Sequence, residues 1–125
     1  MTAFFHPIRV YWEDTDGGGI VYYANYLKFA ERARTEWLRA LGHNQTALRE
    51  SAGVVFVVRD CRIRYKAPAR LDDMLEVSVE VAATTKHKIQ LKQTVARGSD
   101  TCAELTVELV AVDAAGKLTE IPISF

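Results

Sequence analysis

The second half of the chain consists of segments in which apolar and polar residues alternate, and this pattern limits the fold more than any other feature. Alternation with a period of two is typical of a β-strand that buries one of its faces. Short polar or glycine-containing connections separate the segments, as expected for antiparallel neighbours in one sheet. The predicted strands are residues 54–66, 74–84, 89–97 and 101–112, and residues 117–124 are predicted as a last strand.

One long amphipathic helix is predicted before these strands, over residues 26–41. Its apolar positions recur every three or four residues, and Gly42 follows the last of them as a natural left-handed stop. The small side chains of Ala30 and Ala33 lie within the apolar stripe, which indicates close packing against a flat partner. The partner that fits best is a sheet.

Two further elements complete the expected fold. Residues 4–14 are predicted as a first strand that places Ile8, Val10 and Trp12 on one face, and residues 45–51 as a short helical connector. A segregated helix with a run of antiparallel strands is an α+β pattern, and 125 residues correspond to a single domain, residues 1–125. Since one helix covers only one face of such a sheet, we expect another subunit to cover an apolar edge or face.

The first predicted strand ends in two carboxylates, Asp14 and Asp16, which are followed by three glycines and then by the helix start. Glycine reaches positive φ and lets a ligand approach the main chain closely. The helix start directs free backbone N–H groups and the positive end of its dipole toward the same place. A hydrolase that acts on a carbonyl group needs such an acid beside such donors. The alternative is a simple turn, because Asp before Gly is common in turns and caps.

Composition excludes several other classes of protein. Sixteen acidic residues balance sixteen basic ones, whereas a nucleic-acid-binding domain usually carries a net positive charge. Neither a signal peptide nor an apolar run long enough to span a membrane is visible, so we expect a cytoplasmic protein. Cys61 and Cys102 are far apart and in no ligand spacing, which favours free thiols over a disulfide or a zinc site. Neither a metal nor an organic cofactor is expected.

The stretch from Tyr11 to Tyr26, YWEDTDGGGIVYYANY, resembles the hot-dog thioesterases of the 4-hydroxybenzoyl-CoA type. The helix sequence ERARTEWL and the later segments that begin at Phe56 and Pro68 extend the resemblance over nearly the whole chain. The most similar branch is that of acyl-CoA thioesterases associated with the Tol-Pal envelope system. This resemblance implies a hot-dog fold, in which a five- to six-stranded antiparallel sheet wraps around one long central helix. It also implies homodimers with a continuous sheet, often paired into tetramers, and active sites between subunits.

The resemblance also implies roles for particular residues. Asp16 matches the catalytic carboxylate, which acts either as a nucleophile or as a general base on water. The backbone N–H of Tyr23 matches the donor to the thioester oxygen, although many members of the Tol-Pal branch have histidine at this position. The substrate-binding residues implied around this centre and around the coenzyme A phosphates are Gly19, Val21, Arg59, Lys86, His87 and Lys88, with Arg62, Arg64 and Arg70 as further candidates.

The expected function is therefore hydrolysis of an acyl-CoA, with acyl carrier protein as a second partner that the resemblance allows. A rival hypothesis is a scaffold that binds an acyl chain or acyl carrier protein without cleaving the thioester. A hydroxyacyl dehydratase needs a histidine at the site, but His6, His43 and His87 all lie outside the glycine stretch. Glu31, on the predicted helix, is the alternative acid if Asp16 is only a turn residue.

Overall fold

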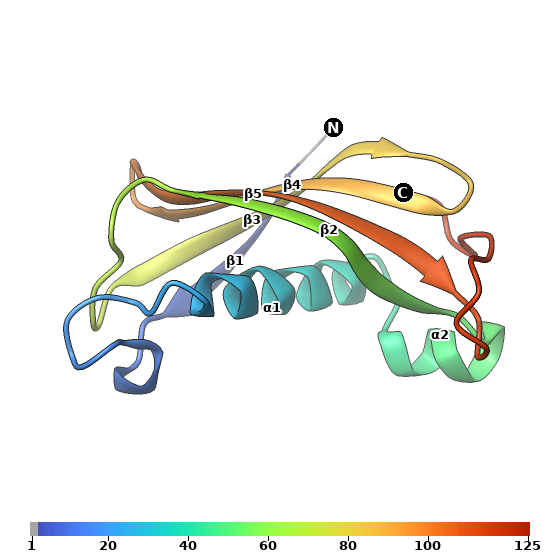
Figure 1. Cartoon of the computed structure of the whole chain (residues 1–125), viewed down its shortest axis with the longest axis horizontal. Helices are drawn as coiled ribbons and strands as arrows, with labels where there is room; N and C mark the ends of the chain where they lie inside the picture. The colour runs from blue at the N-terminus through green and yellow to red at the C-terminus, as the bar shows by residue number, and fades with distance from the viewer. Residues whose placement is uncertain (1–2) are drawn as a thin grey trace.

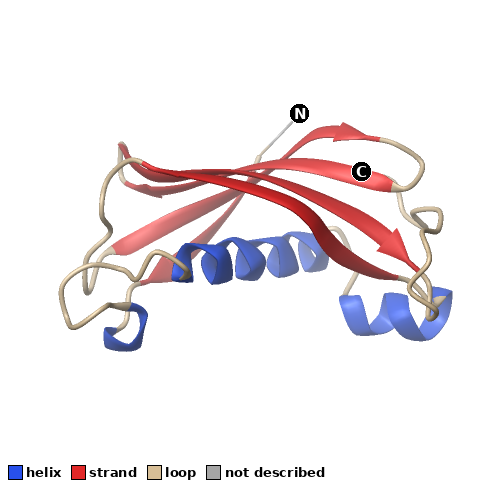
Figure 2. Ribbon diagram, in the orientation of Figure 1, coloured by secondary structure: helices blue, strands red, loops and turns tan. Residues whose placement is uncertain are grey.

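The computed structural model describes residues 3–125 and shows a curved antiparallel sheet with a long helix against its concave face (Figure 1, Figure 2). The sheet has five strands in the order β1-β3-β4-β5-β2, and every neighbouring pair is antiparallel. The predicted α+β hot-dog fold is confirmed. The elements are β1 (Phe4–Arg9), a 3-10 helix η1 (Trp12–Asp14), α1 (Asn25–Ala40), α2 (Gln45–Ala52), β2 (Val55–Tyr65), β3 (Met74–Thr84), β4 (Lys88–Arg97) and β5 (Asp100–Val112).

The three central strands bury one side chain in every two, as their alternation predicts. The concave faces of β3, β4 and β5 provide most of the core, which also includes apolar side chains of α1. The buried residues of these strands include Leu75, Val77, Val79, Ile89, Leu91, Val95, Leu105 and Val107. Burial of this apolar surface is the main force that holds the helix on the sheet.

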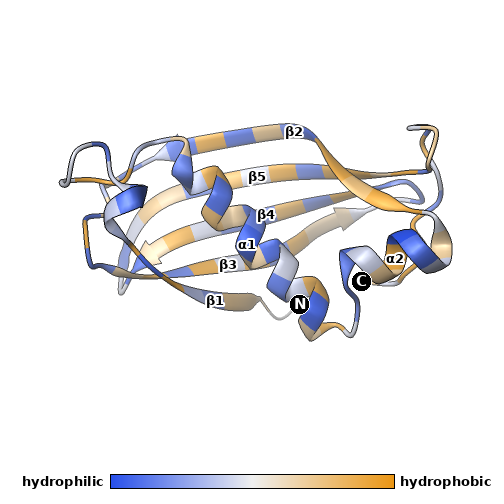
Figure 3. Ribbon diagram, turned by 90° about the horizontal axis from the view of Figure 1, so that it is seen from below, coloured by the Kyte–Doolittle hydropathy of each residue, from blue (hydrophilic) through white to orange (hydrophobic). Residues whose placement is uncertain are grey.

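Helix α1 crosses the sheet diagonally (Figure 3) and makes its main contacts with β3, β1 and β4. Its buried stripe contains the predicted Tyr26, Phe29 and Trp37, and it also contains Leu38, which the spacing did not include. Leu41, by contrast, is exposed and lies just past the end of the helix. Within residues 3–125, none of the helices combines the length and apolar character that crossing a membrane requires.

Two predicted strands differ from the structure. The strand expected over residues 4–14 ends at Arg9, because the chain turns into η1, where the Asp14 carboxylate accepts a hydrogen bond from the Tyr11 backbone N–H. The Trp12 side chain is therefore 67% exposed and does not share a face with Ile8 and Val10.

The strand expected over residues 117–124 is wrong, since this segment makes only an isolated bridge between Leu118 and Val112. Pro122 offers no backbone N–H for a ladder hydrogen bond, and the segment instead carries the Phe125 ring onto Trp37, at a centroid distance of 5.1 Å.

Strand β2 forms one edge of the sheet and differs from the central strands in its surroundings. It packs on β5 and on the short helix α2, and most of its side chains are exposed, both apolar and charged ones. Val57, Val58 and Tyr65 are all at least 40% exposed. A register shift between Val58 and Asp60 marks a β-bulge, which bends the strand. The sheet thus has an open, partly apolar side next to α1.

Candidate active site

The segment from Asp14 to Tyr22 is a short paired loop with a defined conformation. The Tyr22 N–H donates to the Asp14 carbonyl at 2.9 Å, and the Asp16 N–H donates to the Ile20 carbonyl at 3.0 Å. Thr15 and Val21 form an antiparallel bridge between these two hydrogen bonds. Asp16 therefore lies directly opposite Ile20, and its backbone is held by the loop itself.

Two of the three glycines are required by this loop. Gly17 and Gly18 have φ angles of +127° and +92°, in a region that side chains with a Cβ rarely adopt. A Cβ on Gly18 would also lie 2.5 Å from the Trp12 ring, so the ring covers the glycine directly. Gly19 has no such constraint, because a Cβ there would meet open space.

The two carboxylates have different environments. Asp14 is only 6% exposed, and besides the hydrogen bond from the Tyr11 N–H to its carboxylate, its carbonyl accepts one from the Asn25 side-chain amide at 2.9 Å. It therefore joins the loop to the first turn of α1. The Asp16 side chain is exposed and accepts no hydrogen bond from any group within residues 3–125. Asp16 is thus the carboxylate that is available for chemistry.

A free backbone donor lies just before the start of α1. The backbone N–H of Tyr23 makes no hydrogen bond to another group in the described part of the chain. The Tyr65 hydroxyl, at the end of β2, donates to the Tyr23 carbonyl at 3.0 Å. The Tyr23 carbonyl belongs to the peptide that joins Tyr23 to Ala24, so this bond holds the main chain directly after the free N–H.

A second loop, residues 67–73, is hydrogen-bonded to the first one. The Val21 N–H donates to the Ala69 carbonyl at 2.9 Å, and the Leu71 N–H donates to the Gly19 carbonyl at 3.3 Å. The hydroxyl of the buried Tyr26 accepts a hydrogen bond from the Ala69 N–H at 3.0 Å. The two loops and the helix start therefore form one connected unit.

Arg97, at the end of β4, anchors the second loop to the sheet. Its guanidinium donates to the Pro68 carbonyl at 3.1 Å and to the Asp73 carboxylate at 2.8 Å. Burial acts to raise the pKa of Asp73, but the hydrogen bonds from Arg97 and from the Arg70 N–H outweigh it and hold the pKa below its usual value. The anchor is therefore a charged pair at neutral pH.

An apolar pocket of about 320 Å³ opens where these parts meet. Burial raises the pKa of Tyr26 and of Tyr65, which keeps both phenols neutral and able to serve as hydrogen-bonding groups. Ile20, whose carbonyl accepts the hydrogen bond from the Asp16 N–H, is one of the residues that line this pocket. The lining residues are Ile20, Val21, Tyr23, Tyr26, Tyr65, Lys66, Ala67 and Pro68.

Within one chain, the structure does not bring the expected coenzyme A ligands to this pocket. Lys86 and His87 lie in the hairpin between β3 and β4, at the opposite end of the sheet from the Asp16 loop (Figure 1). The length of β3 puts about 35 Å between these two ends. Lys88 and Arg59 lie close to each other, because both form an ion pair with Glu108, at 3.6 Å and 2.9 Å.

Among the further basic candidates, Arg70 is the one beside the paired loop of residues 14–22, since it forms an antiparallel bridge with Ile20. Arg62 and Arg64 lie on β2 and are exposed. The structure thus brings together Asp16, Gly19, Val21, Tyr23 and Arg70, and it separates them from Arg59 and Lys86–Lys88.

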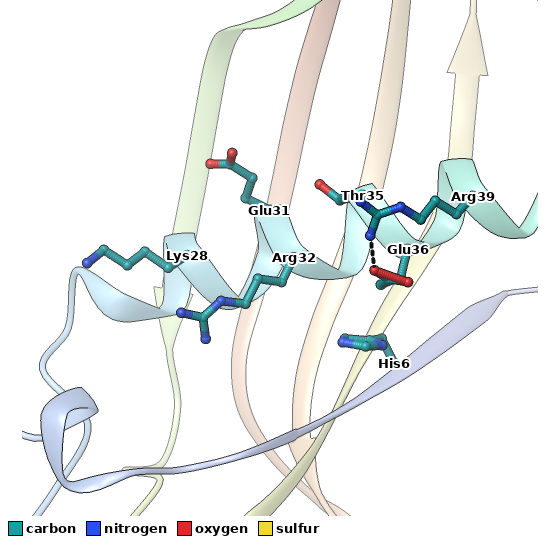
Figure 4. A pocket seen from close by; sticks show the side chains of 7 residues that line it. All are labelled: His6, Lys28, Glu31, Arg32, Thr35, Glu36 and Arg39. Carbon is teal, nitrogen blue, oxygen red and sulfur yellow. Dashed lines mark hydrogen bonds and ion pairs between the residues drawn. The ribbon is translucent and has the colours of Figure 1, made fainter. Parts of the chain in front are cut away.

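Glu31, the alternative acid, lies on a different surface. It is one of seven residues that line a charged groove of about 460 Å³ between the outer face of α1 and β1 (Figure 4). His6 reaches into this groove from β1, and Glu36 and Arg39 form an ion pair along it. Neither His43 nor His87 belongs to the loops that surround Asp16. Within residues 3–125, no three His, Cys, Asp or Glu side chains are grouped so that they could hold a metal ion.

Sequence reasoning missed Tyr65, Tyr26 and the 67–69 segment as parts of the site. Tyr65 ends a strand more than 40 residues after Tyr23, and only the tertiary fold brings the two together. Tyr26 was predicted as a core residue of the helix, which it is, but its hydroxyl also holds the second loop. An aromatic residue at the end of an edge strand is the sole pattern that could have indicated Tyr65.

The chain is similar in sequence to known thioesterases. The profile of the thioesterase-like superfamily matches residues 10–125. The chain is 43% identical over 123 residues to the acyl-CoA thioesterase YbgC of Haemophilus influenzae, covering 98% of this chain and 88% of that protein. It is 46% identical over 113 residues to the acyl-CoA thioester hydrolase YbgC of an Escherichia coli O6:H1 strain, covering 90% and 84%.

A solved structure of a probable thioesterase from Bartonella henselae superposes with a TM-score of 0.93. Its sequence is 32% identical, and the match covers 97% of this chain and all of that one. The chain belongs to the thioesterase-like superfamily, and the resemblance inferred from its motif is confirmed. The most extensive matches among these relatives carry the name YbgC, in agreement with the predicted Tol-Pal branch.

Proposed function

We propose that the paired loop and the helix start carry out the chemistry of an acyl-CoA thioester hydrolase, with Asp16 as the catalytic carboxylate. The family and its acyl-CoA-cleaving relatives establish the reaction class, and the observation that supports Asp16 is its exposed carboxylate, which accepts no hydrogen bond within residues 3–125 and belongs to a residue paired with Ile20 of the apolar pocket. The products are a free acid and coenzyme A, and the groups named here need no metal.

The carboxylate can act in two chemically complete ways. As a nucleophile, an Asp16 oxygen attacks the thioester carbon, the coenzyme A thiolate leaves, and water then hydrolyses the mixed anhydride. As a general base, Asp16 takes a proton from water, the oxygen of which attacks the carbon, and the coenzyme A thiolate leaves. When water attacks the anhydride at the Asp16 carbon, a single turnover in heavy-oxygen water separates the two routes, because the product then carries an ordinary oxygen from Asp16 and the heavy oxygen stays in the Asp16 carboxylate.

The Tyr23 N–H is proposed to donate to the carbonyl oxygen as negative charge develops there. A well-directed donor of this kind stabilises a transition state by about 2 to 4 kcal/mol. Three features support this role: the N–H has no internal partner, it belongs to the turn that starts α1, and Tyr65 fixes the peptide that follows it.

A second copy of the chain is proposed to complete the site. Strand β2 is an edge strand of 11 residues with exposed apolar side chains, which is a surface suited to pairing with another sheet. Antiparallel pairing of two β2 strands would place the partner's hairpin end beside the Asp16 end of this chain. Lys86, His87, Lys88 and Arg59 of one chain would then bind the phosphates of a coenzyme A held by the other.

We propose a dimer of dimers as the full assembly. Acyl carrier protein is proposed as a second acyl donor, because the same exposed cations suit its phosphate-bearing arm. The cytoplasm is the proposed location, which agrees with two free thiols, one of them exposed. Sedimentation and cell fractionation test the assembly and the location.

The decisive test for the catalytic proposal is Asp16→Asn, which keeps the shape of the side chain but removes its charge. We expect thiol release from butyryl-CoA to fall at least about 100-fold, which corresponds to about 2.7 kcal/mol of transition-state stabilisation. Glu13→Gln, a neighbouring exposed acid, is the matched control and should keep full activity. Full activity in Asp16→Asn would refute the assignment, and binding without any cleavage by the wild type would favour a scaffold.

A further inference from the structure

Gln93 is the least expected residue of the core, because it is polar, 0% exposed and in the middle of an otherwise apolar strand face. Its amide nitrogen donates to the Ala30 carbonyl of α1 at 3.1 Å and to the Ser78 carbonyl at 3.3 Å. Its amide oxygen accepts from the Arg34 guanidinium at 3.0 Å. A fully satisfied amide in this position holds Arg34 in one orientation.

Arg34 lies on the side of α1 that faces β2, and its guanidinium extends into the fold. Burial is the main reason that its pKa lies below the usual value, and the Glu31 carboxylate opposes this shift. A guanidinium remains charged in a protein, so a cation is held between the helix and the sheet here. Gln93 bonds both the Arg34 guanidinium and the Ala30 carbonyl. The guanidinium therefore lies at the height of Ala30 along the axis of α1.

Two apolar spaces lie along α1 and β2, and in the order of the helix Arg34 follows the residues of the first space and belongs to those of the second. The first is the pocket at the Asp16 end, which includes Tyr26 of α1 and Tyr65 of β2. The second, of about 280 Å³, starts at Glu31 and Arg34 and continues toward the far end of the sheet. Its apolar lining consists of Trp37, Leu38, Phe56, Val57, Val58, Ile89, Leu109 and Phe125.

We infer that the Arg34–Gln93 pair closes the inner end of the acyl pocket and limits the length of the acyl group. This inference rests on the proposed function, in which the thioester carbonyl lies at the Tyr23 N–H. Seven residues of helix separate Tyr23 from Ala30, which is about 10 Å and corresponds to an extended chain of about eight carbons. A longer chain would have to break the Arg34–Gln93 hydrogen bond or lie against a desolvated cation, and both are unfavourable.

The predicted substrates are therefore short-chain, medium-chain and single-ring aromatic acyl-CoAs. Each further methylene that is buried normally raises affinity about fourfold. This gain should stop at the barrier, so that octanoyl and palmitoyl chains bind with similar affinity. With the cation removed, the second space becomes available, and affinity should continue to rise with chain length.

The test measures binding rather than turnover, so that it does not depend on the role of Asp16. The probes are ketone analogues of butyryl-, octanoyl- and palmitoyl-CoA, in which a methylene replaces the thioester sulfur, titrated by calorimetry into wild type and Arg34→Met. We expect the palmitoyl analogue to bind at least tenfold more tightly to Arg34→Met than to wild type, with the butyryl analogue unchanged within twofold. Arg39→Met, on the outer face of α1, is the matched control and should show the wild-type profile.

Arg34→Met leaves the buried Gln93 oxygen without its partner, so a second variant, Arg34→Met with Gln93→Leu, removes both groups if the single variant does not fold. A wild-type affinity that keeps rising from the octanoyl to the palmitoyl analogue would overturn the inference. An unchanged profile in both Arg34 variants, or no binding of any analogue, would do the same. Failure of the catalytic proposal would be seen differently. The analogues would still bind with the expected profile, but the corresponding acyl-CoAs would release no thiol.

Discussion

The sheet has two halves that share one sequence pattern and differ in what covers them. On β3 and β4 the alternate apolar side chains lie beneath α1 and are buried, whereas on β2 they remain largely exposed. β3 and β4 each have a neighbouring strand on both sides within the sheet, and their buried face packs against α1 of the same chain. The open half contains Tyr65 and borders both apolar spaces. Stability therefore depends mainly on the covered half, whereas the proposed assembly and substrate binding depend on the open one.

The largest predicted effect is on the covered half. Leu91→Ala, at a fully buried position of β4, should lower the free energy of unfolding by about 3 kcal/mol, because the cavity it leaves cannot collapse beneath the helix. Urea denaturation at fixed protein concentration measures this change. Leu118→Ala, at an exposed position, is the control and should change the free energy by less than about 0.5 kcal/mol. If Leu91→Ala and Leu118→Ala lowered the free energy of unfolding equally, stability would not depend mainly on the covered half.

The next effect concerns the open half and tests whether β2 pairs with a second chain. Val58→Lys adds a charge to a side chain that is 48% exposed on the edge strand. We expect the dimer dissociation constant to rise at least about 30-fold, equivalent to about 2 kcal/mol, while each chain stays folded. Analytical ultracentrifugation with circular dichroism measures both quantities. An unchanged dissociation constant would show that the dimer does not form through β2.

A smaller effect should follow from removing one hydroxyl group at the site. Tyr65→Phe deletes the donor to the Tyr23 carbonyl and keeps the ring, so kcat should fall about tenfold, or about 1.4 kcal/mol, with KM almost unchanged. Steady-state kinetics with butyryl-CoA separates the two parameters. Tyr11→Phe is the matched control and should leave both unchanged. A rise in KM alone would indicate that Tyr65 binds the substrate and does not position the helix start.

The smallest effect is the pH dependence of the Asp73–Arg97 anchor. Because the folded state holds the pKa of Asp73 below its usual value near 4, the pair stabilises the fold above that value and loses this contribution as the pH falls through the folded pKa. Arg97→Met should therefore lower the free energy of unfolding at pH 7 and lower it less at pH 3. Arg62→Met, on the exposed surface of β2, should show no such dependence. If Arg97→Met lowered the free energy of unfolding by the same amount at both pH values, the loss would come from the hydrogen bond to the Pro68 carbonyl alone and not from the ion pair with Asp73.

The sequence was sufficient to predict the sheet and the helix because both depend on local periodicity. Alternation is enough to predict that β3 and β4 each bury one face, but it contains no information on the partners of the Gln93 amide. It failed for residues 117–124, where alternation is present but the segment forms only the Val112–Leu118 bridge and no strand ladder. Periodicity shows that a segment can be a strand, whereas pairing depends on the tertiary fold.

The candidate site was only partly predictable for the same reason. Asp16 and the glycines are adjacent in sequence and form a recognisable pattern, and the positive φ angles of Gly17 and Gly18 account for two of the three glycines. Tyr65, Ala69 and Arg97 reach the site from distant strands and loops, and no local pattern marks them. The distance of Lys86–Lys88 from Asp16 was not predictable either, because it depends on the direction in which each strand runs.

The contact between Trp12 and Gly18 also has a spectroscopic consequence. The chain has two tryptophans: Trp12 is exposed and lies against the catalytic loop, whereas Trp37 is buried and stacked on Phe125. Acrylamide should quench the fluorescence of Trp12 and leave that of Trp37 largely unaffected. With Trp37→Phe, the remaining emission comes from the loop alone, so the protein carries its own optical reporter of ligand arrival at Asp16.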